Sequence, residues 1–215
     1  MPSLYEILEQ LEFITRELAI LGLFLSGALM VLVRDWRASL LGLLGQYLLA
    51  GLILSRLVLP EVALIKVLVG ALICPMLYLA ARQAGWGNGR SLLPRPGRRG
   101  IFPGGLAFNL LAVTLMALLA VTLSRSYPMP VIPADVGIGS YWLILNGLLI
   151  LILTEEVLKA GQGLLTGIIG FELLYTPLER SLALVWMWAV VNLLLTLAIA
   201  YLVVVRRAGS SEGGL

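Results

Sequence analysis

The sequence predicts an all-α protein, a polytopic bundle of about seven transmembrane helices. Of its 215 residues 60% are hydrophobic and 13% charged, and the mean hydropathy is +1.00. Soluble domains hold roughly 45–50% apolar residues. The apolar residues here form unbroken runs long enough to cross the hydrocarbon of a bilayer as helices. Because lipid offers no partner for backbone N–H and C=O groups, and because the runs do not alternate with polar residues, we expect helices rather than a barrel.

Seven apolar segments are long enough to be spans. They cover residues 18–34, 38–58, 61–81, 104–124, 140–158, 161–180 and 183–205. Glycine, proline and charged residues separate them, as is typical of the joints between helices. The first residues are acidic and lack a basic region, which argues against a cleaved signal peptide and favours a retained first helix.

The lysine and arginine residues of the loops are distributed unequally between the two sides of this arrangement. Ten lie on one side: Arg34, Arg37, Arg82, Arg90, Arg95, Arg98, Arg99, Lys159, Arg206 and Arg207. Four lie on the other: Arg16, Arg56, Arg125 and Arg180. By the positive-inside bias we expect the N-terminus outside, the C-terminus in the cytoplasm, and 83–105 as the largest cytoplasmic loop. Its basic residues could also contact anionic lipid or a soluble partner.

The chain carries the pattern of an internal repeat. When LLGLLGQYLLA (40–50) is set over TGIIGFELLYT (166–176), Gln46 falls on Glu172, and the same offset places Lys66 on Asn192. A parallel repeat has its two units related by an axis along the membrane normal. We therefore expect a three-helix repeat in 1–82, the loop 83–105, a linking helix and outer loop in 106–139, and a second repeat with a cytoplasmic tail in 140–215.

Glu172 is the leading candidate for a functional residue. It lies in the run IIGFELLY, where a charged carboxylate in lipid is costly and is usually paired, protonated or facing water. It could carry a proton, or it could hold helices together through a hydrogen bond. Lys66 lies about 9 Å from the start of its helix, since each residue rises about 1.5 Å. Its long stem could reach the outer interface, or its ammonium could face the bundle as the counter-ion of a carboxylate.

Four further polar residues are candidates for an ion path or its coupling. Gln46 and Asn192 cannot titrate, but they could hold water molecules or join helices by hydrogen bonds. Glu155 and Glu156 lie near the expected cytoplasmic end of the fifth helix, where an ion could enter. They could equally be solvated, with one of them paired to Lys159 one turn away.

Several function classes find no support in the sequence. The chain has no histidine and a single cysteine, Cys74, in an apolar segment, so neither a disulfide framework nor a zinc site is expected. Nucleotide-binding loops and the HExxH and CxxC patterns are missing, so we expect no cofactor and no catalysis by this chain alone. The net charge of +3 reflects basic loops rather than a nucleic-acid partner.

Short motifs resemble a known family. The segment GLLTGIIGFELL (163–174) resembles the second helix of the small K subunit of bacterial NADH-quinone oxidoreductase, complex I, with Glu172 at the place of a membrane glutamate. The segments VLVRDWRASLLGLLGQ (31–46) and ALIKVLVGALI (63–73) resemble helices 2 and 3 of that subunit, with Gln46 and Lys66 at two glutamate positions. The third helix is closer to the hydrogenase-4 component E branch, which also carries a lysine there.

The resemblance implies a non-redox membrane subunit of a complex I-like or group 4 hydrogenase-like assembly that moves protons or sodium ions. Its partners would be other membrane subunits, antiporter-like ones among them, and lipid, in a bacterial or archaeal cytoplasmic membrane. It would bind no flavin, cluster or quinone. Only one of the four matched positions is acidic, which favours charge coupling over passage of protons through both halves. The alternatives are the small K-like component of a multi-subunit cation/proton antiporter, a self-sufficient transporter, and a structural scaffold.

Overall fold

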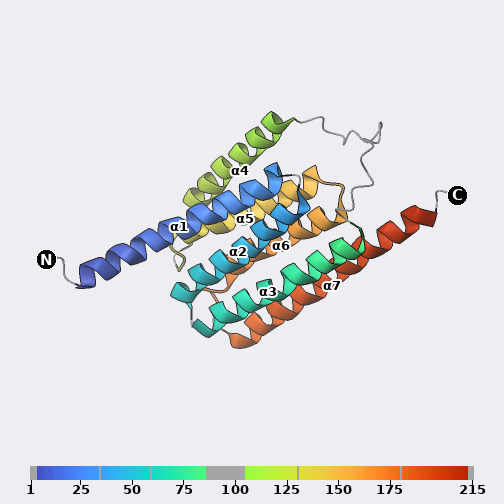
Figure 1. Cartoon of the computed structure of the whole chain (residues 1–215). Helices are drawn as coiled ribbons and strands as arrows, with labels where there is room; N and C mark the ends of the chain where they lie inside the picture. Colours follow the sequence, from blue (N-terminus) through green and yellow to red (C-terminus); the bar gives the residue numbers. More distant parts are fainter. Residues whose placement is uncertain are drawn as a thin grey trace.

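A computed structural model describes residues 4–33, 35–58, 60–85, 105–129, 131–179 and 181–212. Within these ranges the chain forms seven helices and no strand, which confirms the all-α prediction (Figure 1). The helices are α1 (Leu4–Leu32), α2 (Trp36–Leu57), α3 (Pro60–Gln83), α4 (Leu106–Ser126), α5 (Ala134–Leu153), α6 (Val157–Tyr175) and α7 (Leu182–Glu212). Arg34, Arg180 and most of the predicted cytoplasmic loop, residues 86–104, lie outside the described residues.

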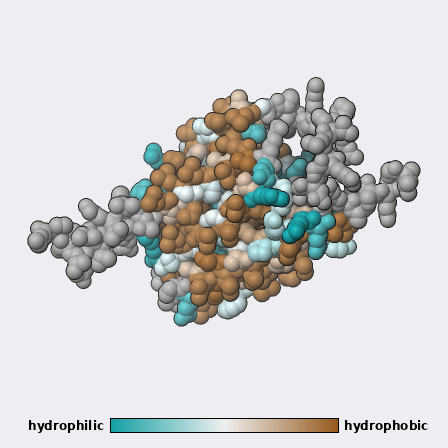
Figure 2. Space-filling model, viewed as in Figure 1, coloured by the Kyte–Doolittle hydropathy of each residue, from teal (hydrophilic) through white to brown (hydrophobic). Residues whose placement is uncertain are grey.

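Six of the described helices, α2 to α7, are long and apolar enough to cross a membrane. The apolar part of α1, Glu17–Leu32, is shorter than the other six. Large apolar side chains, most of them leucines, are exposed along the helices, and Figure 2 shows them covering much of the face in view. Apolar side chains on the outside of a bundle are what lipid requires. The chain is therefore a multi-pass membrane protein with six candidate spans.

The ends of the helices follow from local chemistry. Asp35 precedes α2, and its side chain accepts a hydrogen bond from the backbone N–H of Arg37, as an N-cap residue does. Pro60 is the first residue of α3 and Pro133 directly precedes α5. Proline suits these positions because the first N–H groups of a helix have no partner within it.

Two predicted spans were misplaced along the sequence. Helix α5 occupies Ala134–Leu153 rather than 140–158, and α6 occupies Val157–Tyr175 rather than 161–180. Thr154 has extended backbone angles and ends α5, so Glu155 and Glu156 lie in the connection between the two helices. At the other end Pro177 cannot continue α6 and disfavours helical geometry in the residue before it.

Neighbouring helices pack in a regular order. Helix α2 lies against α1 and α3, and α6 lies against α5 and α7. Helix α1 also contacts α5, α2 contacts α6, and α3 contacts α7, which joins the two halves of the chain along three interfaces. Helix α4 packs on α5 and α1 at the edge of the bundle, and α1 and α7 project from its opposite ends (Figure 1).

Glycine residues allow α5 and α6 to approach closely. A Cβ atom on Gly147 would lie 2.5 Å from the carbonyl oxygen of Gly163, and one on Gly170 would lie 2.7 Å from the carbonyl oxygen of Ser140. Small residues at such an interface bring the backbones of membrane helices together. This contact fixes the position of α6, which carries Glu172.

Candidate intramembrane charge site

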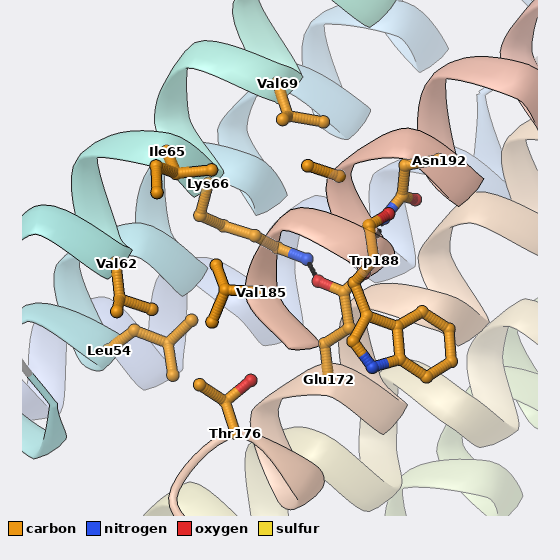
Figure 3. Close-up of a pocket in the computed structure, with 11 residues that line it drawn as sticks. Leu54, Val62, Ile65, Lys66, Val69, Glu172, Thr176, Val185, Trp188 and Asn192 are labelled. Atoms are coloured by element: carbon orange, nitrogen blue, oxygen red, sulfur yellow. Dashed lines mark hydrogen bonds and ion pairs between the residues drawn. The ribbon is translucent and has the colours of Figure 1, made fainter. Parts of the chain in front are cut away.

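Lys66 of α3 and Glu172 of α6 form an ion pair inside the bundle, between Nζ and Oε2 (Figure 3). Lys66 is 6% exposed and Glu172 is 4% exposed. The lysine thus faces the other helices, so its ammonium acts as the counter-ion of the carboxylate and does not reach the surface. The ammonium also lies 5.4 Å from the ring centroid of Tyr47, within the range of a cation–π interaction.

Two further residues hold the second carboxylate oxygen of Glu172. Asn192 of α7 donates from Nδ2 to Oε1 of Glu172, and also to the backbone carbonyl of Trp188. The hydroxyl of Tyr47 on α2 donates to Oδ1 of Asn192 over 3.2 Å. Four helices therefore contribute to one hydrogen-bonded charge site, which we call the Lys66–Glu172 site and define by Lys66, Glu172, Asn192 and Tyr47.

A small cavity of about 20 Å³ adjoins this site. Its polar lining comes from Lys66, Glu172, Asn192 and Thr176, and the indole of Trp188 lies beside Glu172 (Figure 3). The indole Nε1 is buried and has no hydrogen-bond partner among the described residues. The cavity has room for about one water molecule, and the polar groups around it are enough to bind one.

Gln46 lies outside this cluster, on the interface between α2 and α6. It is fully buried, and its Oε1 accepts a hydrogen bond of 2.8 Å from the hydroxyl of Thr166. A second hydrogen bond between the same helices joins the hydroxyl of Ser39 to Oε1 of Gln162. Gln46 directly precedes Tyr47, so it adjoins the Lys66–Glu172 site through its neighbour in the chain.

Glu155 and Glu156 are exposed and lie at the other end of α6 from Glu172. Sixteen residues separate Glu156 from Glu172, which corresponds to about 24 Å along a helix. Nearby, Nζ of Lys159 donates to the carbonyl oxygen of Val33 at the end of α1 over 3.2 Å. The structure thus brings together Lys66, Glu172 and Asn192 and leaves the two glutamates at one end of the bundle.

Some polar contacts were not anticipated from the sequence. On α5, Trp142 Nε1 donates to the carbonyl of Leu23 and Asn146 Nδ2 to that of Gly27, each over 3.1 Å. The unforeseen partners at the α2–α6 interface are Ser39, Gln162, Thr166 and Tyr47. Their signal was spacing, because residues four or seven apart lie on one face of a helix. Trp142 with Asn146, Gln162 with Thr166, and Ser39 with Gln46 each follow it.

Comparison with known protein families, characterised proteins and solved structures found no match to this chain. The resemblance to the K subunit and to hydrogenase-4 component E stays a prediction from short motifs. What is established is a multi-pass helical membrane protein with a buried ion pair between two of its candidate spans.

Proposed function

We propose that this chain is a membrane subunit of a complex I-like or group 4 hydrogenase-like assembly that moves protons or sodium ions, and that the Lys66–Glu172 site couples to the moving charge. The observation that carries the proposal is the buried ion pair itself. Ionisable side chains are rare within membrane helices, and where they occur they usually mark ion paths or charge relays. The site lies where the resemblance places the membrane glutamate.

The geometry suits a charge relay. Glu172 accepts on one oxygen from Asn192 and faces the Lys66 ammonium with the other. If Glu172 takes up a proton, the lysine keeps its charge without a carboxylate beside it, and the ring of Tyr47 is its nearest remaining attractive group. Electrostatic interactions are strong in this low-dielectric interior. An ion that moves in a neighbouring subunit would therefore be felt at Glu172, and the reverse.

We further propose that α1 is a seventh crossing and that α1–α3 and α5–α7 are parallel repeats, with the N-terminus outside. The contacts α1–α5, α2–α6 and α3–α7 support this, because equivalent helices on either side of an axis along the membrane normal can lie next to one another. The matched positions also support it. Lys66, Glu172 and Asn192 meet in one site, and Gln46 adjoins that site through Tyr47.

The proteins that co-purify in mild detergent test the assembly. Iron–sulfur subunits with nickel or flavin subunits are the expected result. Antiporter subunits without any redox subunit would instead identify the small K-like component of a cation/proton antiporter. Purified chain in liposomes should move no ions alone, and robust flux would contradict both of these assignments. Replacing Glu172 by Gln in the whole assembly tests the role of the site itself.

A further inference from the structure

A file of buried polar side chains follows the α2–α6 interface from one end of the bundle to Glu172. At the end where α5 meets α6 lies a cavity of about 10 Å³, lined by Glu156, Lys159, Ser39 and Gln162 among others. Glu156 is exposed, whereas Ser39 and Gln162 are 2% and 1% exposed. The cavity therefore adjoins both an exposed carboxylate and the first buried pair of the file.

Each following step lies deeper along the same interface. One turn after Gln162 on α6, Thr166 donates to Gln46 of α2. Tyr47 follows Gln46 and donates to Asn192, which donates to Glu172. From Gln162 to Glu172 the file covers about 15 Å, at about 1.5 Å per residue of α6.

Two amide groups in this file have hydrogen-bonding capacity that the protein does not use. The Oε1 atoms of Gln162 and Gln46 each accept from a hydroxyl, of Ser39 and Thr166 respectively. Their Nε2 atoms are buried without a partner among the described residues. Buried donors of this kind are normally satisfied by ordered water. Two such donors in one file point to water molecules along it.

The opposite side of Glu172 is less polar. Between the Lys66–Glu172 site and the α6–α7 connection, the cavity is lined by Leu54, Val62 and Val185, and Thr176 is the polar residue on that side. Apolar side chains at a constriction exclude water, which disfavours proton movement. The two sides of Glu172 thus differ in their ability to hold a chain of water molecules.

We infer that protons reach Glu172 from the α5–α6 end, through water molecules held by Gln162, Thr166 and Gln46. The inference deepens the proposed function and rests on Glu172 being the group that is loaded. A proton from solvent near Glu156 passes from water to water and binds the Glu172 carboxylate. The carboxylate becomes a neutral acid, the ion pair is lost, and Lys66 keeps its three protons. No electron is transferred.

The test follows hydrogen–deuterium exchange of the Glu172 carboxyl by infrared spectroscopy in the full chain in lipid nanodiscs. Lys66→Met removes the counter-ion, and a buried carboxyl without one takes up a proton. Its C=O band is assigned by its loss in Lys66→Met/Glu172→Gln. In D₂O we expect Gln162→Leu with Thr166→Val to slow the band shift severalfold. Ser124→Ala, a matched loss of a buried hydroxyl on α4, should leave the rate unchanged.

Slower exchange in Thr176→Val, with no change in Gln162→Leu/Thr166→Val, would place the access route on the α6–α7 side and overturn the inference. So would equal rates in all variants. If Lys66→Met does not fold, a cryo-EM map of the unaltered assembly that resolves water provides the second test. Water at Nε2 of Gln162 and Gln46 is expected, and dry contacts there would overturn the route. Normal ion pumping in Glu172→Gln with exchange along the file would instead overturn the proposed function alone.

Discussion

Asn192 of α7 donates a hydrogen bond to the carboxylate of Glu172, the same carboxylate that pairs with Lys66 of α3. One acidic side chain of α6 thereby holds α3 and α7 in place. A carboxylate buried within a bundle is stable only when its charge is paired and its oxygens are hydrogen-bonded, and both conditions are met here. The predictions below start from this arrangement.

Removing one partner of the ion pair should cost more stability than removing both. Lys66→Met alone leaves Glu172 without its counter-ion, and breaking a buried pair in this way costs about 3–5 kcal/mol. Lys66→Met/Glu172→Gln removes both charges and keeps an amide for Asn192, so it should recover most of the loss. Thermal unfolding in detergent measures both variants. Glu156→Gln, at an exposed site, is the control, and losses that simply add would contradict a coupled pair.

The close approach of α5 and α6 should make Gly147 intolerant of any side chain. Gly147→Ala would place its methyl 2.5 Å from the carbonyl oxygen of Gly163. Overpacking of this kind costs about 1–3 kcal/mol. Gly167→Ala is the matched control, since nothing lies within 4 Å of its added Cβ atom. The yield of monodisperse protein should fall for the first variant only, and equal yields would show that the two helices can separate at little cost.

Trp142 should anchor α1 to α5. Trp142→Phe removes the hydrogen bond to the carbonyl of Leu23 and keeps an aromatic ring beside Phe24, which stacks on the indole at 4.7 Å. We expect a loss of about 1 kcal/mol, the net value of one hydrogen bond, in the free energy of unfolding. Trp186→Phe, at an exposed position of α7, should change nothing. A larger effect at Trp186 would point to a contact outside this chain.

The orientation can be tested at the two ends of α6. Cys74 is the single cysteine of the chain, so Cys74→Ala gives a background without thiols. Glu155→Cys and Glu179→Cys then place one thiol at each end, both at exposed positions. A membrane-impermeant maleimide should label Glu155→Cys from the cytoplasmic side only and Glu179→Cys from the outside only. The reverse pattern would contradict the proposed topology, and labelling of both from one side would contradict a spanning α6.

Much of the helical fold follows from length and composition, because apolar runs of this kind can only be membrane helices. The ends of α5 and α6 were less predictable, since Thr154 and Pro177 stop helices within runs that are otherwise apolar. Glu172 and Lys66 were both expected to matter. That they pair could not be read from the sequence, because a lysine stem is long enough to reach either the interface or the bundle.

The remaining polar contacts depend on which helices face one another. Gln46 bonds to Thr166, and Ser39 bonds to Gln162, across the α2–α6 interface. Spacing within each helix places these residues on one face. Their partners become evident only when α2 and α6 are adjacent, which a single sequence does not specify.

The most direct test of the central claim is the number of ions moved per electron in sealed vesicles that contain the whole assembly. With Glu172→Gln, we predict that ion pumping falls while electron input continues in part. Glu179→Gln, at an exposed position beyond the end of α6, should pump as the unaltered assembly does. An unchanged number of ions per electron in Glu172→Gln would contradict a role for the Lys66–Glu172 site in ion movement.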